Sequence, residues 1–269
     1  MKIILSLITV MSFLGLITYN VKKPAVSNEP TKVSPRTQEE IPLSKGKSPV
    51  LVELFTSQGC SSCPPADKNL AFLEKQQPSS EAEIITLSLH VDYWNRLGWT
   101  DVFSSPKYSE RQGFYSNTFK LGGEVYTPQM VVDGTHQFVG GNMNEANKAI
   151  SSSAKSSKAK IDLSISGGKL KVKISELPEH SYSNVFLAVA ENNLSTNVKR
   201  GENGGKALSH VSVVRELKTI GTIAEEDKSF ETETTLQMPV AWKKENLKFV
   251  VFIQVEKTSR IIGVNQIKL

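Results

Sequence analysis

The sequence predicts an α/β domain with a helical insertion, followed by a mostly β, sandwich-like C-terminal domain. Two patterns indicate this division. Strand and helix signals alternate up to about residue 158, and from residue 161 onward short strands of alternating polarity follow one another. The length of 269 residues suffices for two domains, because single hydrophobic cores stop growing at roughly 250–300 residues. We therefore expect the domains to cover residues 49–158 and 159–269.

The N-terminal part of the chain predicts export. Met1 and Lys2 precede an apolar run at residues 3–19, which is typical of a targeting segment. No small-x-small cleavage site follows the run, and residues 3–20 are long enough to span a bilayer core of ~30 Å. Residues 1–21 are therefore expected to be a signal peptide or an N-terminal membrane anchor. Both alternatives place the remaining chain in the periplasm or outside the cell, in the second case tethered to the membrane.

Residues 22–48 are expected to form a disordered linker. They hold four of the twelve prolines, with many polar and charged residues and few large apolar ones. Such a composition buries too little surface to offset the entropy of ordering the chain. The segment is therefore interpreted as a spacer between the membrane and the folded part.

Between residues 49 and 158, strands and helices are expected to alternate. The near-continuous apolar run at residues 50–55 is typical of a strand buried on both faces. In the aromatic-rich region 92–120, Pro106 favours a helix start just after Ser105 or Ser104, and this helix is the expected insertion. The other elements are expected at residues 67–76 (helix), 84–91 (strand), 125–132 with 137–139 (hairpin, turning at Asp133-Gly134) and 143–159 (helix).

Beyond residue 159 the pattern changes to short strands. Apolar and polar residues alternate at residues 161–165 and again at 170–174, with Gly167-Gly168 between them. Further strands are expected at residues 185–190, 211–217, 230–236 and 249–255. A succession of short strands with turn signals between them favours a sandwich-like arrangement.

The charge distribution argues against binding to nucleic acid. The formal net charge is +5, but the 32 Lys and Arg are interspersed with 27 Asp and Glu. Nucleic-acid-binding proteins instead cluster their basic residues on one face. We expect no nucleic-acid partner, and contact with a membrane only through the N-terminal segment.

The chemistry of the sequence is concentrated at its two cysteines, Cys60 and Cys63. Their spacing allows a disulfide, and the free N–H groups and dipole of a helix N-terminus stabilise a thiolate. Three interpretations remain open: a redox-active pair, a structural disulfide and a soft-metal thiol site. A bridge across about four residues stabilises by only about 2 kcal/mol, which favours redox chemistry over a structural bridge. Zinc would need two more ligands, so we expect no metal and no cofactor.

Three neighbouring features bear on this pair. Glu53 is a lone carboxylate in the apolar strand, where it is costly unless paired or functional, and it either accepts the proton of Cys63 or is satisfied structurally. Asp67 is interpreted as an acid in the first helical turn, favoured by the helix dipole. Thr127-Pro128 starts a predicted strand, a position that proline favours.

These motifs together resemble the thioredoxin superfamily over residues 49–158. They match its strand carboxylate, its active-site cysteine pair and its cis-proline loop. A closer resemblance extends over residues 49–269 to a family of secreted bacterial thioredoxin-like proteins catalogued as a domain of unknown function. It is carried by the segments at residues 53–67, 90–94, 126–129 and 200–203.

The resemblance implies a thioredoxin-like α/β domain and an exported thiol–disulfide oxidoreductase acting on protein thiols or disulfides. Cys60 would be the exposed nucleophile, Cys63 the resolving thiol and Glu53 the proton acceptor. A cis bond between Thr127 and Pro128 would border the substrate groove. The alternative is a non-enzymatic binding module in which the disulfide is structural.

The sequence departs from ordinary thioredoxins in two places. Gly59 stands where they carry a tryptophan, so the apolar surface that grips a substrate peptide is expected to be reduced. Pro64 and Pro65 remove two N–H donors from the first helical turn. We therefore expect Cys60 to be less activated, and the disulfide more reducing, than in strongly oxidising relatives.

Weaker signals lie elsewhere. His90 and Asp92 are expected on one face at the end of the second strand, where they would bind a metal, shuttle protons or cap a loop. The Gly-rich turn at residues 201–205 lacks the setting of a phosphate-binding loop. His210 and Arg215 lie in or beside a predicted strand, and His210 is interpreted as a structural hydrogen-bonding residue.

Overall fold

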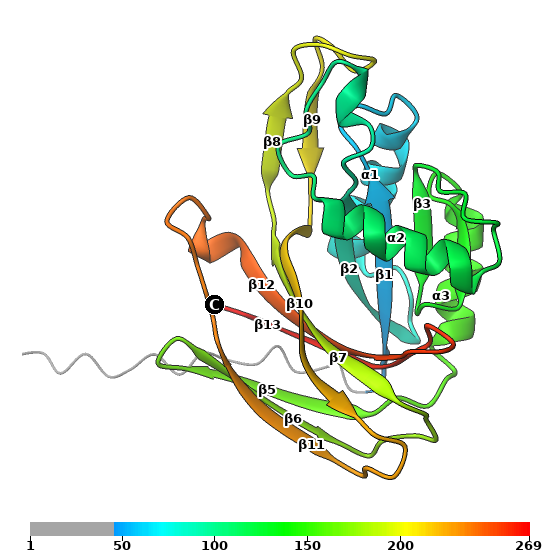
Figure 1. The fold of residues 1–269 in the computed structure, drawn as a ribbon, viewed down its shortest axis with the longest axis vertical. Coiled ribbons are helices and arrows are strands. Elements are labelled where there is room, and N and C mark those ends of the chain that lie inside the picture. Colours follow the sequence, from blue (N-terminus) through cyan, green and yellow to red (C-terminus); the bar gives the residue numbers. More distant parts are fainter. Residues whose placement is uncertain (1–45) are drawn as a thin grey trace, which may run out of the picture. The chain divides into compact units, whose positions relative to one another are not determined.

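The computed structural model describes residues 46–269, and an eight-stranded sheet is its main element (Figure 1). The strand order in this sheet is β13-β12-β7-β10-β2-β1-β3-β4. The strands are β1 (Ser48–Thr56), β2 (Ala82–His90), β3 (Gln129–Val132), β4 (His136–Val139), β7 (Ser183–Glu191), β10 (Val213–Ile223), β12 (Leu247–Val255) and β13 (Ile261–Lys268). Their apolar runs, above all in β1 and β12, are buried almost throughout, as expected for strands covered on both faces.

The direction of the strands brings two loops together. β1 and β2 pair in parallel, and β10 pairs in parallel with the other edge of β2. Helix α1 (Cys63–Gln76) supplies the crossover that the parallel pair of β1 and β2 requires. Because parallel strands end at the same edge of a sheet, Thr56 lies beside His90. The segments that follow β1 and β2 therefore start from neighbouring positions.

Helices cover both faces of the large sheet. α1 and α3 (Met143–Ser153) pack on one face, in a core with Leu54 and Leu70. α2 (Pro106–Thr118) packs on the opposite face through Tyr108 and Tyr115, and it crosses β1 and β2 in the view of Figure 1. Two short 3-10 helices, η1 (Asn95–Leu97) and η2 (Lys244–Asn246), lie in loops.

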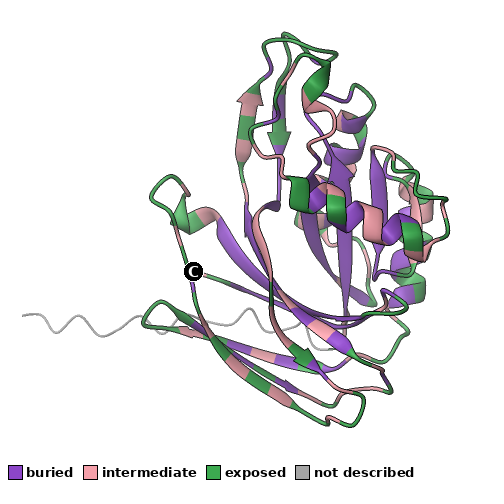
Figure 2. Cartoon of the chain, in the orientation of Figure 1, coloured by how far each residue is buried: buried purple, intermediate pink, exposed green. Residues whose placement is uncertain are grey.

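A three-stranded sheet and a separate hairpin complete the fold. The three-stranded sheet has the order β11-β6-β5 and packs on β7, β12 and β13 through side chains such as Leu163, Val172 and Phe249. Its outward-facing residues are exposed or half-buried, whereas the central strands of the large sheet, β1 and β2, are almost completely buried (Figure 2). The strands concerned are β5 (Lys160–Ser166), β6 (Lys169–Ser175) and β11 (Phe230–Thr235), and the hairpin consists of β8 (Leu194–Asn197) and β9 (Ala207–His210).

The predicted fold class is wrong. The described chain is mostly β, and no separate thioredoxin-like α/β domain with a helical insertion is present in residues 46–269. Strands from before and after residue 158 join one mixed sheet, in which Val213 of β10 pairs with Ser88 of β2. α2 begins at Pro106, where the proline predicts a helix start, but it packs on this shared sheet. The prediction failed because the sequence does not indicate which strand pairs with the second edge of β2. In the structure this strand is β10.

The predicted signal or anchor at residues 1–21, and all but the last three residues of the predicted linker at 22–48, lie outside the described residues. Within residues 46–269, no helix has the length and apolar character needed to cross a membrane.

Candidate functional site

The cysteine pair lies where β1 leads into α1. After the strand ends, a turn closed by the bond from the Cys60 N–H to the Ser57 carbonyl (3.2 Å) brings the chain to Cys63, the first residue of the helix. Cys60 and Cys63 form a disulfide, with their Cα atoms 5.5 Å apart. Pro64 and Pro65 occupy the first turn of α1, so this turn offers fewer N–H groups to a sulfur than an ordinary one.

Both cysteines are completely buried, with exposed fractions of 0%. This differs from the expectation that Cys60 is exposed. Two polar atoms lie near the Cys60 Sγ: the hydroxyl of Ser62 at 3.3 Å and the carbonyl oxygen of Thr127 at 3.9 Å. The peptide bond between Thr127 and Pro128 is cis. The structure thus brings four of the five predicted site residues together.

The loop at the tip of the β8–β9 hairpin is bound to the turn that carries Cys60 and forms a cover over this turn. Asn203 is fully buried and donates hydrogen bonds to the carbonyl oxygens of Gln58 (2.9 Å) and Cys60 (2.8 Å). Glu202 accepts a hydrogen bond from the Ser61 N–H (2.9 Å), and its hydrogen bonds to Ser61 lower the pKa of the Glu202 carboxyl. The Gly-rich turn that carries no phosphate-loop signal is therefore a cover for the turn that carries Cys60.

Trp94 contributes an aromatic side chain beside the pair. A Cβ on Gly59 would lie only 3.3 Å from the Trp94 Cβ, so a glycine leaves room for this tryptophan. The Trp94 indole N–H donates to the Thr127 hydroxyl at 2.8 Å and ties the loop after β2 to the cis-proline loop. The sequence shows that position 59 lacks a tryptophan, and the aromatic residues after the second strand are the only sequence signal for Trp94 as its neighbour.

Glu53 faces away from the cysteine pair. Its neighbour Leu54 packs on the α1 side of the sheet, and successive strand residues point to opposite faces, so Glu53 points toward α2. There Arg111 binds both of its carboxylate oxygens, at 2.6 and 3.0 Å, and the Tyr115 hydroxyl donates to one of them. Burial lowers the pKa of Arg111, but Glu53 more than compensates and raises it above its usual value. This placement does not suit the role predicted for Glu53, proton acceptor of Cys63.

Four titratable side chains are buried together near the end of β2. His90 Nδ1 lies 2.7 Å from an oxygen of Asp101, and the His210 ring meets the His90 ring edge to face, with centroids 4.7 Å apart. His210 Nδ1 lies 3.8 Å from an oxygen of Asp67, one turn of α1 beyond Cys63. None of these four side chains exceeds 7% exposure.

The pair of His90 and Asp101 is charge-coupled. Burial alone lowers the pKa of His90, but the charge and hydrogen bond of Asp101 outweigh burial and raise it. Burial raises the pKa of Asp101, and His90 together with the backbone N–H groups of Gln58 and Phe103 lowers it to below its usual value. Asp101 also anchors the turn before Cys60 through the 2.8 Å bond from Gln58.

The predicted association of His90 with Asp92 does not form. β2 ends at His90, and the Asp92 carboxylate instead accepts a hydrogen bond from the Ser109 hydroxyl at 2.5 Å. Asp101, the actual partner of His90, lies in a loop whose sequence gave no signal. Arg215 stacks over Phe103, with its guanidinium carbon 5.3 Å from the ring centroid.

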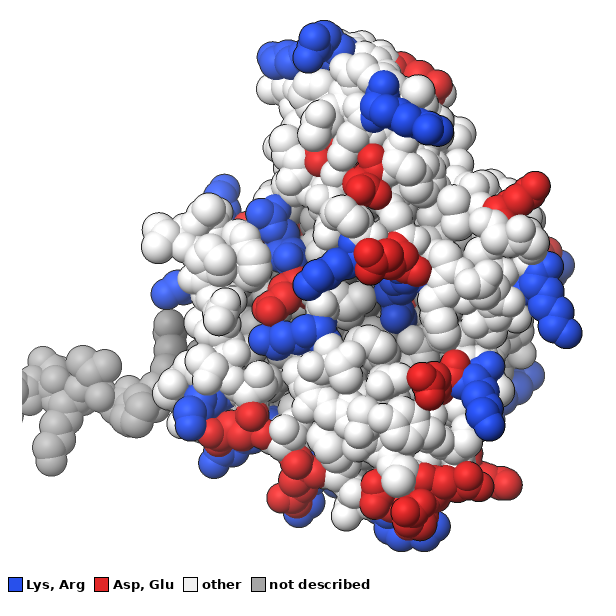
Figure 3. All heavy atoms as spheres, in the orientation of Figure 1, with Lys and Arg blue, Asp and Glu red and all other residues white. Residues whose placement is uncertain are grey.

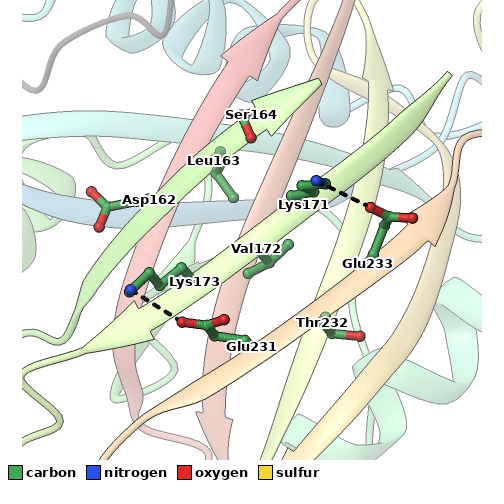
Figure 4. Close-up of a pocket in the computed structure, with 9 residues that line it drawn as sticks. All are labelled: Asp162, Leu163, Ser164, Lys171, Val172, Lys173, Glu231, Thr232 and Glu233. Carbon is green, nitrogen blue, oxygen red and sulfur yellow. Dashed lines mark ion pairs between the residues drawn. The ribbon is translucent and has the colours of Figure 1, made fainter. Parts of the chain in front are cut away.

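The other surface regions of residues 46–269 described next have charged side chains that are interspersed or paired with one another. On the face shown in Figure 3, basic and acidic residues are interspersed. A hollow on the outer side of the three-stranded sheet is lined by charges that pair with one another, Lys171 with Glu233 at 3.7 Å and Lys173 with Glu231 at 3.1 Å (Figure 4). No group of three or more His, Cys, Asp or Glu side chains within residues 46–269 is arranged to hold a metal ion.

Comparison with known proteins gives a family and a fold. The sequence model of the family described as "Protein of unknown function (DUF1223)" matches residues 51–254, so the chain belongs to this family. No curated protein matches the chain. A protein of Agrobacterium tumefaciens with a solved crystal structure is 26% identical, over 81% of this chain and 93% of that one, with a TM-score of 0.65. HBP35 of Porphyromonas gingivalis is 16% identical, over 83% of this chain and 76% of that one, with a TM-score of 0.58, which shows a similar fold.

Proposed function

We propose that this member of the DUF1223 family is an extracytoplasmic thiol–disulfide redox protein with Cys60 and Cys63 as its redox pair. The observation that carries the proposal is the disulfide at the first turn of α1. A bridge across four residues contributes only about 2 kcal/mol through chain entropy, so stabilisation alone is a weak reason for placing one here. A helix N-terminus also favours the thiolate, which is the reactive form of cysteine.

The surroundings of Cys60 support its assignment as the attacking sulfur. The Thr127 carbonyl oxygen lies 3.9 Å from the Cys60 Sγ, and the Trp94 side chain lies beside Gly59, the residue before Cys60. A backbone carbonyl next to a reactive sulfur can accept an N–H from an extended substrate segment. This local arrangement resembles the active site of thioredoxin-like proteins, and the likeness concerns the site rather than the fold class.

In the reducing direction, the Cys60 thiolate attacks one sulfur of a protein disulfide and the other substrate sulfur leaves as a thiolate. Cys63 then loses its proton and attacks the Cys60 Sγ, which re-forms the Cys60–Cys63 disulfide and releases the second substrate thiolate. The two substrate thiolates take up the two protons lost by Cys60 and Cys63. Two electrons pass to the substrate, and the oxidising direction is the reverse.

Cys60 and Cys63 have exposed fractions of 0%, so access to Cys60 requires movement of its surroundings, and we assign this movement to the loop that is bound to the Cys60 turn. Two hydrogen bonds of Asn203 and the exposed one of Glu202 tie the loop to the turn that carries Cys60, and Gly201 lies beside Trp99. The three hydrogen bonds contribute about 1 kcal/mol each, so breaking them costs less than unfolding the chain.

A redox titration against glutathione tests the proposal, with free thiols trapped and counted at each ratio. We expect reversible exchange of two thiols in the folded protein, and a potential well below the roughly −120 mV of the strongest periplasmic oxidants. The Cys60→Ser variant should lose insulin reduction completely, whereas Ser61→Ala, a matched change within the same turn, should keep it. A potential near that oxidising limit would contradict the expected effect of Pro64 and Pro65.

A structural disulfide in a non-enzymatic binding module is the second candidate, and the complete burial of both sulfurs favours it. On this alternative, the native disulfide resists mild dithiols. The Cys60→Ser variant then loses about 2 kcal/mol of stability without any change in exchange activity.

A further inference from the structure

The inner face of α1 carries an acid one helical turn beyond Cys63. Cys63 and Asp67 are four residues apart on the helix, and both are buried. Residues four apart share one helix face, and side chains tilt toward the helix N-terminus, so the Asp67 carboxylate leans over the turn that contains Cys63. The next buried residues along this face, Leu70 and Leu73, are apolar.

Asp67 differs from the other buried acids of the described chain because one of its oxygens is unpartnered. Glu53 is held by Arg111, and Asp133 is paired with Lys158 at 2.6 Å. Asp67 Oδ1 has no hydrogen-bond partner within residues 46–269. Buried polar groups are almost always hydrogen-bonded, so a carboxylate left in this state beside a redox pair calls for a chemical reason.

Two histidine side chains with unpartnered ring nitrogens lie behind Asp67. His210 Nδ1 lies 3.8 Å from Asp67 Oδ1, within ion-pair range but too far for a hydrogen bond, and neither ring nitrogen of His210 has a partner. The His90 ring packs on His210 with an unpartnered Nε2, and its Nδ1 is bound to Asp101. From β10, Arg215 adds a positive charge that acts on His90.

We propose that Asp67 accepts the Cys63 proton when the disulfide forms and returns it when the disulfide is reduced, with His210 as the basic group behind it. The inference rests on the proposed redox function and assigns its proton acceptor. As the Cys63 S–H bond breaks, the proton moves to the Asp67 carboxylate. The sulfur electron pair then forms the bond to Cys60 Sγ, and the bond from Cys60 to the substrate sulfur breaks with its electrons on the substrate.

A role as proton acceptor also explains why Asp67 is paired with a histidine and not with a lysine or arginine. A carboxylate that becomes neutral on accepting a proton needs no permanent cation, which would hold it ionised. A nearby histidine can accept the proton next, so Asp67 is restored for another cycle.

The test follows the reduced full-length chain as it reacts with 5,5′-dithiobis(2-nitrobenzoate). Two aromatic thiolates are released per protein: the first when Cys60 forms the mixed disulfide, and the second when Cys63 displaces the reagent from it. In Asp67→Asn, we expect the second phase to slow by about 100-fold near neutral pH, the typical contribution of a general base. This loss should close above pH ~9, where a thiol ionises without help.

Control variants separate this role from a structural one. Glu74→Gln alters another acid on α1, which is bound to Lys248 at 2.8 Å, and should lower stability while leaving the pH profile of the second phase unchanged. Asp67→Glu should restore much of the rate at neutral pH. His210→Gln should slow the second phase in the same pH range as Asp67→Asn, and serves as the test if Asp67→Asn does not fold.

The outcomes distinguish the two proposals. A rate loss of equal size at every pH, or a profile of Asp67→Asn and His210→Gln identical to wild type, overturns the role of Asp67 and leaves the redox function intact. If the folded wild-type protein releases no aromatic thiolate at any pH, the redox function fails and the proton acceptor fails with it.

Discussion

Replacing Glu53 by leucine should destabilise the protein without impairing its redox chemistry. Both Glu53 and Arg111 are nearly inaccessible, with side-chain exposures of 1% and 6%. The substitution leaves the Arg111 guanidinium buried with two neutral partners, Gln254 at 3.1 Å and Tyr115 at 3.0 Å. Removing one partner of a buried ion pair costs about 3–5 kcal/mol. At about 2–4 °C per kcal/mol for a chain of this size, Tm should fall by roughly 6–20 °C.

The double variant Glu53→Leu with Arg111→Met tests whether Glu53 and Arg111 stabilise the protein only as a pair. The guanidinium lies between the rings of Phe186 and Phe252, with its carbon 5.3 and 5.1 Å from their centroids, so a methionine there finds apolar surroundings. Apolar replacements of both partners are often neutral, and we expect the double variant to come within about 2 kcal/mol of wild type in urea unfolding. Additive losses would refute the coupling.

The single variant Glu53→Leu also tests whether Glu53 takes part in the redox reaction. If its only role is to hold Arg111, the pH profile of the second aromatic-thiolate release in Glu53→Leu will be that of wild type. A profile displaced toward higher pH would instead return Glu53 to the role of proton acceptor for Cys63.

Three further changes test other parts of the structure. The raised pKa of His90 means that its bond to Asp101 contributes stability that is complete below the unfolded pKa of ~6.5 and is lost as the pH rises through the folded pKa. Urea unfolding between about pH 6 and 9 should show this loss, and His90→Gln should remove most of the slope. Asn203→Ala should speed reduction of the disulfide by dithiothreitol several-fold and cost about 1–3 kcal/mol; an unchanged rate would show that its loop is no barrier. Gly134→Ala, at a φ of +67°, would press a methyl group against the Ser259 carbonyl, and a loss below about 1 kcal/mol in the same unfolding assay would contradict this contact.

Sequence patterns predicted those elements whose causes are local. Pro106 marks the start of α2, and Asp133-Gly134 lies in the turn between β3 and β4. The alternation at residues 170–174 predicts β6, because one face of that strand is exposed and the other buried. In each case a few neighbouring residues contain the whole signal.

The arrangement of these elements depends on distant contacts and could not be predicted. The pairing of Val213 with Ser88 joins the two halves of the chain into one sheet, yet neither segment indicates its partner. β8 was missed because it is short and only partly buried, and β13 because Gly263 interrupts its apolar run. The predicted division into an α/β domain and a mostly β one failed at this step.

The same dependence on distant residues limited prediction of the site. The spacing of Cys60 and Cys63 predicts the pair, but the side chains around the pair belong to loops that are far apart in the sequence. Asn203 and His210 come from beyond residue 158, and no local pattern distinguishes a covering asparagine from a surface one. The sequence around Asp67 indicates only a first-turn acid, because His210 lies far away along the chain.

Because both halves of the chain contribute to the site, its chemistry has to be measured on a chain that contains both. The first half supplies the cysteine pair and Asp67, whereas the second half supplies the Asn203 cover and the His210 ring. Without the second half, the β2 edge that β10 covers would be open and the disulfide would lose its cover. A fragment ending near residue 158 would therefore present an exposed cysteine pair with a different proton acceptor environment. Its potential and reactivity would describe that exposed pair, so the redox chemistry proposed for this family has to be measured on the intact chain.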